Sequence, residues 1–269
     1  MTGVLSGRTA LVTGGSRGIG AATARALAGL GARVVITYRK DAESAGRVVE
    51  DCRALSGAAE GLHADLGDAQ GAEDLVAGLR GIGAEVDVAV SNATTSHLRL
   101  GLVELPTEDL LAKVDADLAV PHRLLQRLIG GMQQRGFGRF IVISSGHAVG
   151  PSARGMAAYG VAKAALEALV RYAAAEEGHS GVTVNAVRPS FVLTDASRDV
   201  PRPVREAMRK AVPAGRLAVP EDVAGIVSLL AQPAAGWING VSIPATGGLN
   251  HPVDWARLIG LGAGQGGAP

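Results

Sequence analysis

Short runs rich in β-branched residues alternate with stretches rich in alanine and leucine along most of this chain. The first two runs, residues 9–14 and 32–38, are each followed by a helical pattern, at residues 18–30 and 42–55. Strands that are apolar on both faces and separated by helices form parallel sheets with helices on both sides. The alternation therefore predicts an α/β fold built on a doubly wound parallel sheet with right-handed crossovers.

The same pattern sets the extent of the predicted domain. Seven strands are expected, at residues 9–14, 32–38, 59–66, 86–93, 138–145, 181–189 and 240–245. Long helices are expected at 109–134 and 157–177, and no linker or internal repeat divides the chain. We therefore expect one domain over residues 1–250, followed by a glycine-rich C-terminal extension, 251–269, that is partly mobile.

Composition excludes several classes of protein. A formal net charge of +1 gives no basic field for nucleic acid, and a single cysteine leaves neither a disulfide framework nor a zinc cluster. The first residues lack the layout of a signal peptide, and prolines interrupt the uncharged stretch 223–250, whose apolar run is too short for a membrane span. We expect a cytoplasmic protein without nucleic-acid, membrane or metal partners.

A glycine-rich segment, TGGSRGIG at residues 13–20, follows the first expected strand and opens the first expected helix. Glycines at 14, 18 and 20 allow a tight turn and close approach of the backbone to a pyrophosphate at the positive end of the helix. The order of strand, loop and helix is the one that a dinucleotide site requires. The alternative is a glycine-rich surface turn without a ligand.

The end of the second expected strand bears on the choice of cofactor. An NAD site places an acidic side chain there, whereas this chain has Tyr38 followed by Arg39 and Lys40. Together with Arg17, these cations could surround a 2′-phosphate. Asp41 lies near the position of an NAD-type acid, but we expect it to begin the next helix. NADP(H) is therefore predicted in preference to NAD(H), although a solvated charge cluster would give the same pattern.

A tyrosine and a lysine, Tyr159 and Lys163, lie four residues apart in a stretch otherwise built from small apolar residues. On a helix they share one face, and an ammonium near a phenol is expected to lower the pKa of the tyrosine for acid/base chemistry. Hydroxyls at Ser144 and Ser145 end a nearby strand. The alternative is a core tyrosine beside a solvent pair of Lys163 with Glu167.

Six segments in fixed order resemble the short-chain dehydrogenase/reductase family over residues 5–250. They are TGGSRGIG, ADL (64–66), SNA (91–93), ISS (143–145), YGVAK (159–163) and NAVRPSFVLTD (185–195). The resemblance implies a single-domain Rossmann fold and hydride transfer between a nicotinamide and a carbonyl/alcohol pair. The ordered set is specific even though each segment alone is not.

The resemblance also implies roles for individual residues. Tyr159 would protonate the carbonyl oxygen, Lys163 would lower the pKa of Tyr159 and bind the nicotinamide ribose, and Ser145 would hydrogen-bond the substrate oxygen. Asp117 would support Lys163 and completes the catalytic set. The cofactor would be bound by Gly14, Ser16, Arg17, Gly18, Ile19, Gly20, Arg39, Asp65, Leu66, Asn92, Tyr159, Lys163, Pro189, Val192 and Thr194. Within that set, the family pattern puts Asp65 at the adenine and Asn92 at the adenosine ribose.

Three positions depart from the family pattern. Thr94 and Ser190 replace glycines, and Asp117 replaces the asparagine that usually supports the lysine through a water. A branched side chain at Thr94 would shift the backbone or weaken cofactor binding. A carboxylate at Asp117 would stabilise a charged Lys163 but could alter proton relay, or it could simply keep the local geometry.

The resemblance further implies a substrate loop and lid at residues 191–216 and a homo-oligomer, a tetramer or dimer formed through the long helices. The lid is rich in arginine and lysine, which could attract an acidic substrate or an acyl carrier protein, or could be the solvated side of a helix. His97 and His147 follow strand ends and are expected to line the crevice.

These features predict an NADP(H)-dependent oxidoreductase that acts on a carbonyl/alcohol substrate, either free or bound to a carrier protein. A ketoreductase of fatty-acid or secondary-metabolite type is the main hypothesis. The alternatives are an enoyl or imine reductase of the same family and a dinucleotide-binding regulatory protein without turnover.

Overall fold

The computed structural model describes residues 3–67, 69–95, 99–150 and 153–249. Its centre is one parallel sheet of seven strands in the order β3-β2-β1-β4-β5-β6-β7. The strands are β1 (Thr9–Val12), β2 (Arg33–Tyr38), β3 (Ala59–His63), β4 (Val86–Ser91), β5 (Gly138–Ile143), β6 (Val182–Pro189) and β7 (Ser242–Ala245). The predicted fold class, a doubly wound parallel sheet, is confirmed.

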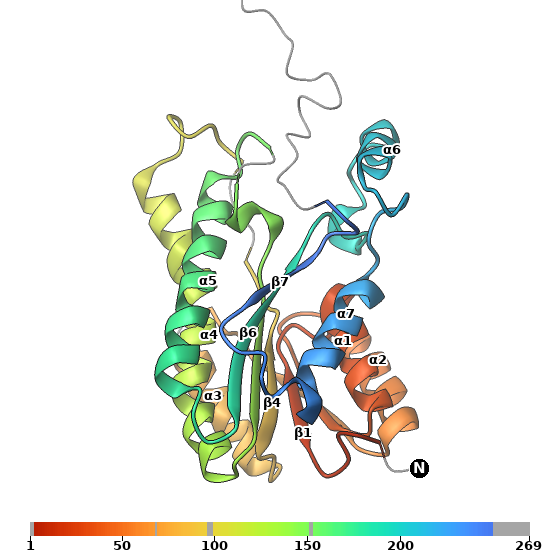
Figure 1. Cartoon of the computed structure of the whole chain (residues 1–269), viewed down its shortest axis with the longest axis vertical. Helices are drawn as coiled ribbons and strands as arrows, with labels where there is room; N and C mark the ends of the chain where they lie inside the picture. The colour runs from red at the N-terminus through yellow and green to blue at the C-terminus, as the bar shows by residue number, and fades with distance from the viewer. Residues whose placement is uncertain (1–2, 68, 96–98, 151–152, 250–269) are drawn as a thin grey trace, which may run out of the picture.

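Helices cover both faces of the sheet (Figure 1). One layer holds α1 (Gly18–Gly29), α2 (Ala42–Ser56) and α7 (Pro220–Ala231), and the other holds α3 (Ala69–Gly81), α4 (Thr107–Gln134) and α5 (Ala157–Glu177). Helix α6 (Arg202–Ala211) and the 3-10 turns η1 (Gly146–Ala148) and η2 (Asp195–Ser197) follow the carboxyl ends of strands, and η3 (Pro233–Ala235) follows α7. Helix α4 contains both Asp117 and an internal proline, Pro121.

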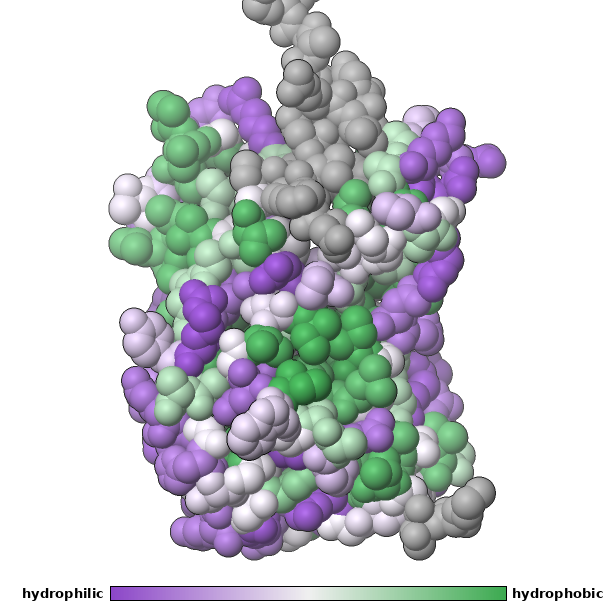
Figure 2. Space-filling model, viewed as in Figure 1, coloured by the Kyte–Doolittle hydropathy of each residue, from purple (hydrophilic) through white to green (hydrophobic). Residues whose placement is uncertain are grey.

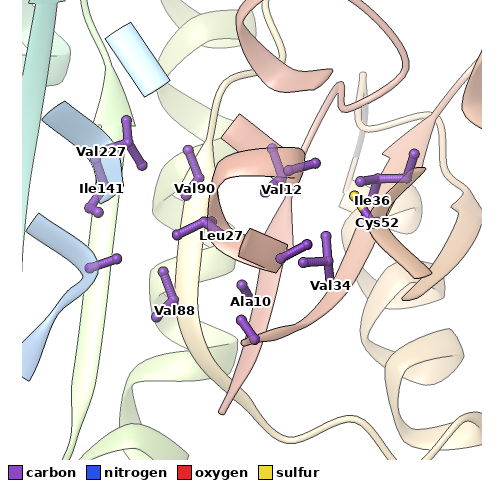
Figure 3. Packing of buried hydrophobic residues seen from close by; sticks show 14 of the residues in the cluster. Ala10, Val12, Leu27, Val34, Ile36, Cys52, Val88, Val90, Ile141 and Val227 are labelled. Carbon is purple, nitrogen blue, oxygen red and sulfur yellow. The ribbon is translucent and has the colours of Figure 1, made fainter. Parts of the chain in front are cut away.

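Neighbouring strand residues alternate between two separate cores. In β1, Val12 packs in the core beneath α1, α2 and α7, whereas Leu11 packs in the core beneath α3, α4 and α5. Val34 and Val35 of β2 divide between the two cores in the same way. Figure 3 shows the first core, with Leu27 of α1 placed over the valines of the central strands. Because successive strand side chains point to opposite faces, a sheet covered on both sides needs apolar residues at every position.

Several strands end sooner than the sequence predicts. The expected strands 59–66, 86–93 and 138–145 end at His63, Ser91 and Ile143. Beyond these residues the chain turns to make contacts with side chains; for example, the backbone N–H of Asn92 donates to the hydroxyl of Thr13 at 3.0 Å. The polar residues that follow the strands therefore belong to loops at the carboxyl edge of the sheet.

The sheet has its topological switch point between β1 and β4, because the chain continues from β1 towards β2 on one side and from β4 towards β5 on the other. Ligands of open α/β sheets bind outside the carboxyl ends of the strands at this point. Among the described residues, no helix is long and apolar enough to cross a membrane. The predicted extension 251–269 lies outside the described residues.

Candidate active site

The loop from β1 to α1 lies at the switch point and depends on its glycines. Gly14 and Gly18 have φ angles of +63° and +53°, a region that side chains rarely adopt. A Cβ on Gly20 would lie 2.2 Å from the carbonyl oxygen of Gly14 and 2.7 Å from the side-chain nitrogen of Asn92. Helix α1 can therefore start this close to β1 only with glycine at residue 20.

Hydrogen bonds of Asn92 and Thr13 hold this loop in place. The side-chain amide of Asn92 donates to the carbonyl oxygens of Thr13 at 3.0 Å and Gly14 at 3.1 Å. The hydroxyl of Thr13 accepts from the backbone N–H groups of Asn92 and Ala93 at 3.0 and 3.1 Å. Asn92 was expected at a ribose, and its side chain is engaged in holding the loop. Thr13 was not singled out from the sequence, although it is the first residue of the glycine-rich segment.

A cleft of about 550 Å³ runs along the carboxyl ends of β1, β2 and β4. It is lined by ten of the predicted cofactor residues: Gly14, Ser16, Arg17, Gly18, Ile19, Arg39, Asp65, Leu66, Asn92 and Thr194. The other predicted residues lie away from its lining. Gly20 is buried in α1, Pro189 is buried at the end of β6, and Val192 forms a bridge with Ala218.

The charges at the β2 end of the cleft are mainly positive. Arg17, Arg39 and Lys40 are exposed there, and Arg39 lies 3.7 Å from the carboxylate of Asp65. Asp41 instead caps α2 as predicted, because its carboxylate accepts from the backbone N–H of Ser44 at 2.9 Å. That backbone hydrogen bond is the main cause that lowers the pKa of Asp41. The glycine cradle and this cationic end together fit a dinucleotide that carries an additional phosphate.

The two serines after β5 have different partners. Ser144 is buried and donates its hydroxyl to Glu167 at 2.7 Å. Ser145 makes a side-chain hydrogen bond with Tyr159, near the start of α5. The structure therefore brings Ser145, rather than Ser144, to the tyrosine, as the family pattern implies.

Lys163 lies on the same face of α5 as Tyr159. Its ammonium is 5.6 Å from the centroid of the Tyr159 ring, donates to the carbonyl of Ile143 at 3.3 Å and lies 3.3 Å from Asp117. The alternative pair of Lys163 with Glu167 in solvent is wrong. Glu167 is buried and accepts two hydrogen bonds from Arg188, each at 2.8 Å.

The expected direction of the tyrosine pKa is also wrong. Burial raises the pKa of Tyr159 above its ordinary value, the hydrogen bond of Ser145 acts to lower it, and the charge of Asp117 raises it further. The main reason is burial of the phenol, which disfavours its charged form; in addition, the carboxylate of Asp117 lies beside the lysine whose charge was expected to act on the phenol. Burial likewise lowers the pKa of Lys163, and Asp117 acts in the opposite direction.

Asp117 and Lys113 form a buried ion pair that the sequence reasoning missed. The side chains of Lys113 and Asp117 are 3% and 0% exposed, and their charged atoms are 2.8 Å apart. Burial would raise the pKa of Asp117, but Lys163, Lys113 and Thr94 outweigh it and hold that pKa below its usual range. A signal was present, since Lys113 lies four residues before Asp117 and so shares its helix face.

The departures from the family pattern at Thr94 and Ser190 also have visible contacts. The Thr94 hydroxyl lies 3.0 and 3.2 Å from the two carboxylate oxygens of Asp117, while the residue itself lines the cleft. The backbone N–H of Ser190 donates to the carbonyl of Ala245 at 3.2 Å. Thr94 thus links the cofactor cleft to the cluster around Tyr159.

The predicted lid, residues 191–216, contains η2 and α6 and encloses a small apolar cluster around Met208. Arg209 pairs with Glu206, and Arg198 pairs with Asp195, so surface carboxylates balance part of the basic charge of this segment. His147 lies in η1 with its ring 5.6 Å from the ring of Tyr159. His97 lies outside the described residues. Within the described ranges, no group of three or more His, Cys, Asp or Glu side chains could hold a metal ion.

Comparisons with known proteins agree with this architecture. The sequence profile of the family described as Enoyl-(Acyl carrier protein) reductase matches residues 14–250. The chain is 35% identical to the 3-oxoacyl-[acyl-carrier-protein] reductase FabG of Pseudomonas aeruginosa, over 91% of this chain and 98% of that protein. It is also 35% identical to the hydroxynaphthalene reductase arp2 of Aspergillus fumigatus, over 88% of this chain and 90% of that protein.

A solved structure shows the same fold. The crystal structure of a 3-oxoacyl (acyl-carrier-protein) reductase from Agrobacterium tumefaciens, with NADP bound, superposes with a TM-score of 0.83 at 35% identity. The superposition covers 91% of this chain and 95% of the other. The sheet and its helices therefore have a counterpart in a reductase whose structure contains NADP.

Proposed function

Because this chain belongs to the short-chain dehydrogenase/reductase family, we propose that it is an NADP(H)-dependent ketoreductase of fatty-acid or secondary-metabolite type. The names of its relatives support this class, since they include reductases of 3-oxoacyl groups on acyl carrier protein and of hydroxynaphthalene. The substrate would be a ketone, either free or attached to a carrier protein, and the product would be the corresponding alcohol.

One observation carries the proposal. The partly exposed tyrosine, Tyr159, forms a hydrogen bond with Ser145, and the ammonium of Lys163 lies 5.6 Å from its ring centroid. Thr94 connects this cluster, through Asp117, to the cleft that the glycine-rich loop lines. A phenol in this setting can exchange a proton with a carbonyl or alcohol oxygen. A binding protein without turnover would have no need for this arrangement.

The residues divide the proposed reaction between them. Gly14 would lie at the pyrophosphate of the dinucleotide, and Arg17 and Arg39 at its additional phosphate; when bound, the dinucleotide supplies a hydride to the carbonyl carbon. Tyr159 would donate its proton to the carbonyl oxygen, so that hydride and proton together convert the ketone to an alcohol. Ser145 would donate a hydrogen bond to the same oxygen and orient the substrate.

The raised pKa of Tyr159 suits the reductive direction. A phenol whose pKa lies above its ordinary value of about 10 stays protonated at neutral pH and is ready to act as an acid. Alcohol oxidation would need the phenolate instead. Ketone reduction should therefore persist through neutral pH and fall only as the pH approaches the pKa of Tyr159, whereas alcohol oxidation should rise with pH.

The charges at the β2 end of the cleft support NADP(H) over NAD(H). Arg17 and Arg39 are exposed at the position where an additional phosphate would lie, and Asp41 is engaged as a helix cap. A carboxylate that caps a helix is not free to accept from a ribose hydroxyl. The predicted preference for NADP(H) is retained in this proposal.

The test is consumption of NADPH in the presence of 3-oxoacyl thioesters and aromatic ketones. The wild-type protein should oxidise NADPH with at least one of them, and Tyr159→Phe should lower kcat by about 100-fold or more while NADPH binding is kept. Cofactor binding without turnover across the panel would favour a regulatory dinucleotide-binding protein. Turnover that is unchanged in Tyr159→Phe would remove the tyrosine from the proposed chemistry.

A second candidate is an enoyl reductase, because the matching family profile carries that description. Reduction of a carbon–carbon double bond places the proton on carbon, so a hydrogen bond from Ser145 to a carbonyl oxygen that becomes an alcohol would not be required. Paired assays with a 3-oxoacyl and a 2-enoyl thioester of equal chain length separate the two. Ser145→Ala should impair only a ketoreductase strongly.

Exposed apolar side chains favour assembly of several copies of the chain. Figure 2 shows an apolar area over α7 and β7. Leu229 of α7 is exposed, as are Trp237 and Val241 in the segment between α7 and β7. Leu111 of α4 and Tyr172 of α5 are exposed as well. We expect these surfaces to form a homodimer or homotetramer, and light scattering on the purified protein measures its mass directly.

A further inference from the structure

Tyr159 has a second buried lysine beside its ring. The ammonium of Lys113 lies 5.4 Å from the ring centroid, about as close as the ammonium of Lys163 at 5.6 Å. Lys113 comes from α4, whereas Tyr159 and Lys163 come from α5. Both ammonium groups are within the range in which a cation acts on an aromatic ring. The chemistry proposed above uses only one of them.

The carboxylate of Asp117 contacts both lysines, and its negative charge offsets their positive charges. One carboxylate oxygen is 2.8 Å from Lys113, and the other is 3.3 Å from Lys163. Its negative charge also raises the pKa of Tyr159, after the larger effect of burial. If Lys163 were the only cation present, Asp117 would cancel its charge, and no net positive charge would remain beside the phenol.

Lys113 changes this balance of charge. Two ammonium groups and one carboxylate leave one net positive charge in the cluster, and the shorter contact of Asp117 is to Lys113. We propose that Lys113 is a positioning residue for the acid/base step: it holds Asp117 as its own partner and thereby leaves the charge of Lys163 to act on Tyr159. The inference rests on the proposed function for the reaction that it serves, but the charge arrangement exists without substrate.

Thr94 is hydrogen-bonded to both Lys113 and Asp117. The ammonium of Lys113 donates to the Thr94 hydroxyl at 3.3 Å and to the carbonyl of Thr95 at 2.7 Å, while the Thr94 hydroxyl donates to Asp117 at 3.0 Å. The three donors of the ammonium therefore have acceptors from α4 and from the loop after β4. Two of the positions that depart from the family pattern, Thr94 and Asp117, belong to this one hydrogen-bonded group with Lys113.

Two other titratable groups, His147 and Glu167, lie near Tyr159 or Lys163. His147 of η1 has its ring 5.6 Å from the ring of Tyr159. One turn beyond Lys163 on α5, Glu167 is held by Arg188 of β6 through two hydrogen bonds and by Ser144, so its charge is balanced locally. Among the described residues packed against Tyr159, Asp117 is thus the carboxylate that Lys113 must offset.

The test measures ionisation of Tyr159 without substrate. The chain has three tyrosines, so a Tyr38→Phe/Tyr172→Phe background leaves Tyr159 as the only source of a tyrosinate absorbance signal. In this background, Lys113→Met should raise the tyrosinate midpoint and Asp117→Asn should lower it. The double variant Lys113→Met/Asp117→Asn again has one net positive charge, and its midpoint should return close to the background value.

A purely structural ion pair predicts a different result. In that case Lys113→Met and Asp117→Asn would lower thermal stability but leave the tyrosinate midpoint in place, and this outcome overturns the proposal. If Lys113→Met fails to fold, the comparison of Asp117→Asn with the double variant still isolates the charge of Lys113, and the double variant should have the higher midpoint. Arg127→Met is the matched control, because Arg127 lies on the exposed side of the same helix as Lys113, where it pairs with Glu73 of α3. The tyrosinate midpoint of Arg127→Met should equal that of the background protein.

The rate of ketone reduction is the second measurement. Lys113→Met should lower kcat for ketone reduction by about 10- to 100-fold, because less positive charge remains to stabilise the phenolate that forms when Tyr159 gives up its proton, and the double variant should recover most of this loss. Additive losses in the double variant would contradict the charge-balance account. If the wild-type protein reduces none of the ketones, the proposed function fails, whereas the tyrosinate titration still decides the role of Lys113.

Discussion

The cofactor cleft and the cluster around Tyr159 both contain cationic side chains, but in opposite surroundings. At the β2 end, Arg17 and Arg39 are exposed, and Arg39 meets Asp65 only at 3.7 Å. In the cluster around Tyr159, Lys113 and Lys163 are buried around the carboxylate of Asp117. Water and salt screen exposed charges, whereas buried charges act strongly on their neighbours.

This difference indicates different tasks for the two sets of cations. Exposed arginines can bind and release a charged cofactor, because each interaction is modest and reversible. Buried lysines cannot be reached by bulk solvent, so their charges act on the pKa of the nearest titratable group instead. The following predictions compare the two sets, beginning with the largest expected effect.

Removing the exposed arginines should change cofactor choice. In Arg17→Ala/Arg39→Ala, the dissociation constant for NADPH should rise by about 100-fold, because two charge-assisted hydrogen bonds to a phosphate are lost. The constant for NADH should rise by less than about threefold. Fluorescence titration with each cofactor measures both values, and Arg80→Ala, an exposed arginine of α3 away from the cleft, is the control. Equal loss for the two cofactors would show that these arginines do not select the phosphate.

In the wild-type protein, ionic strength should affect cofactor binding much more than the ionisation of Tyr159. Raising the ionic strength from about 0.05 M to about 0.5 M should weaken NADPH binding by roughly tenfold, because exposed charges are screened. The tyrosinate midpoint of Tyr159, measured in the same buffers, should hardly move, because the lysines beside it are buried. A midpoint that follows ionic strength as closely as cofactor affinity does would mean that solvent reaches the buried cluster.

The smallest effect is expected at an exposed ion pair near the lid. Asp222 accepts from Arg216 and from the backbone N–H of Val219 at 2.8 Å, which caps α7. The Arg216 hydrogen bond is the main cause that lowers the pKa of Asp222 to about 2. Asp222→Asn should lower the free energy of unfolding at neutral pH by less than about 1 kcal/mol, because it removes the charge, whose interactions solvent screens, while the amide oxygen can still accept from Val219.

The pH dependence of that variant follows from the sign of the shift. A carboxyl with a lowered pKa in the folded state contributes its stability above its unfolded pKa of about 3.9 and loses it as the pH falls towards about 2. Urea unfolding of both proteins should therefore give a difference that is full at neutral pH and shrinks across this acidic range. A constant difference down to pH 2 would assign the effect to packing of the side chain.

The fold and the cofactor cleft could be predicted from local sequence patterns. Apolar runs and glycine spacing depend on neighbours along the chain, so the sheet, the loop at Gly14 and the cap at Asp41 follow from them directly. The preference for Ser145 came from its place after the strand, and the structure gives Ser144 another partner. These features need no knowledge of how distant segments pack.

The charge balance around Tyr159 could not be predicted in the same way. The pKa of Tyr159 depends on burial and on a carboxylate from α4, a helix that the tyrosine meets only in the folded protein. Lys113 would be an ordinary surface lysine if its face of α4 were exposed. The spacing of Lys113 and Asp117 permits an ion pair on one helix face, but only packing of α4 against α5 makes it a buried one.

The central claim is that Tyr159 supplies the proton while NADPH supplies the hydride to a carbonyl carbon. NADPH that carries deuterium at its transferable position tests this most directly, with mass spectrometry of the alcohol formed. The account predicts a single deuterium atom on the former carbonyl carbon in the wild-type product, and only traces of labelled alcohol with Tyr159→Phe. An alcohol without deuterium, or labelled alcohol formed at an unchanged rate by Tyr159→Phe, would contradict it.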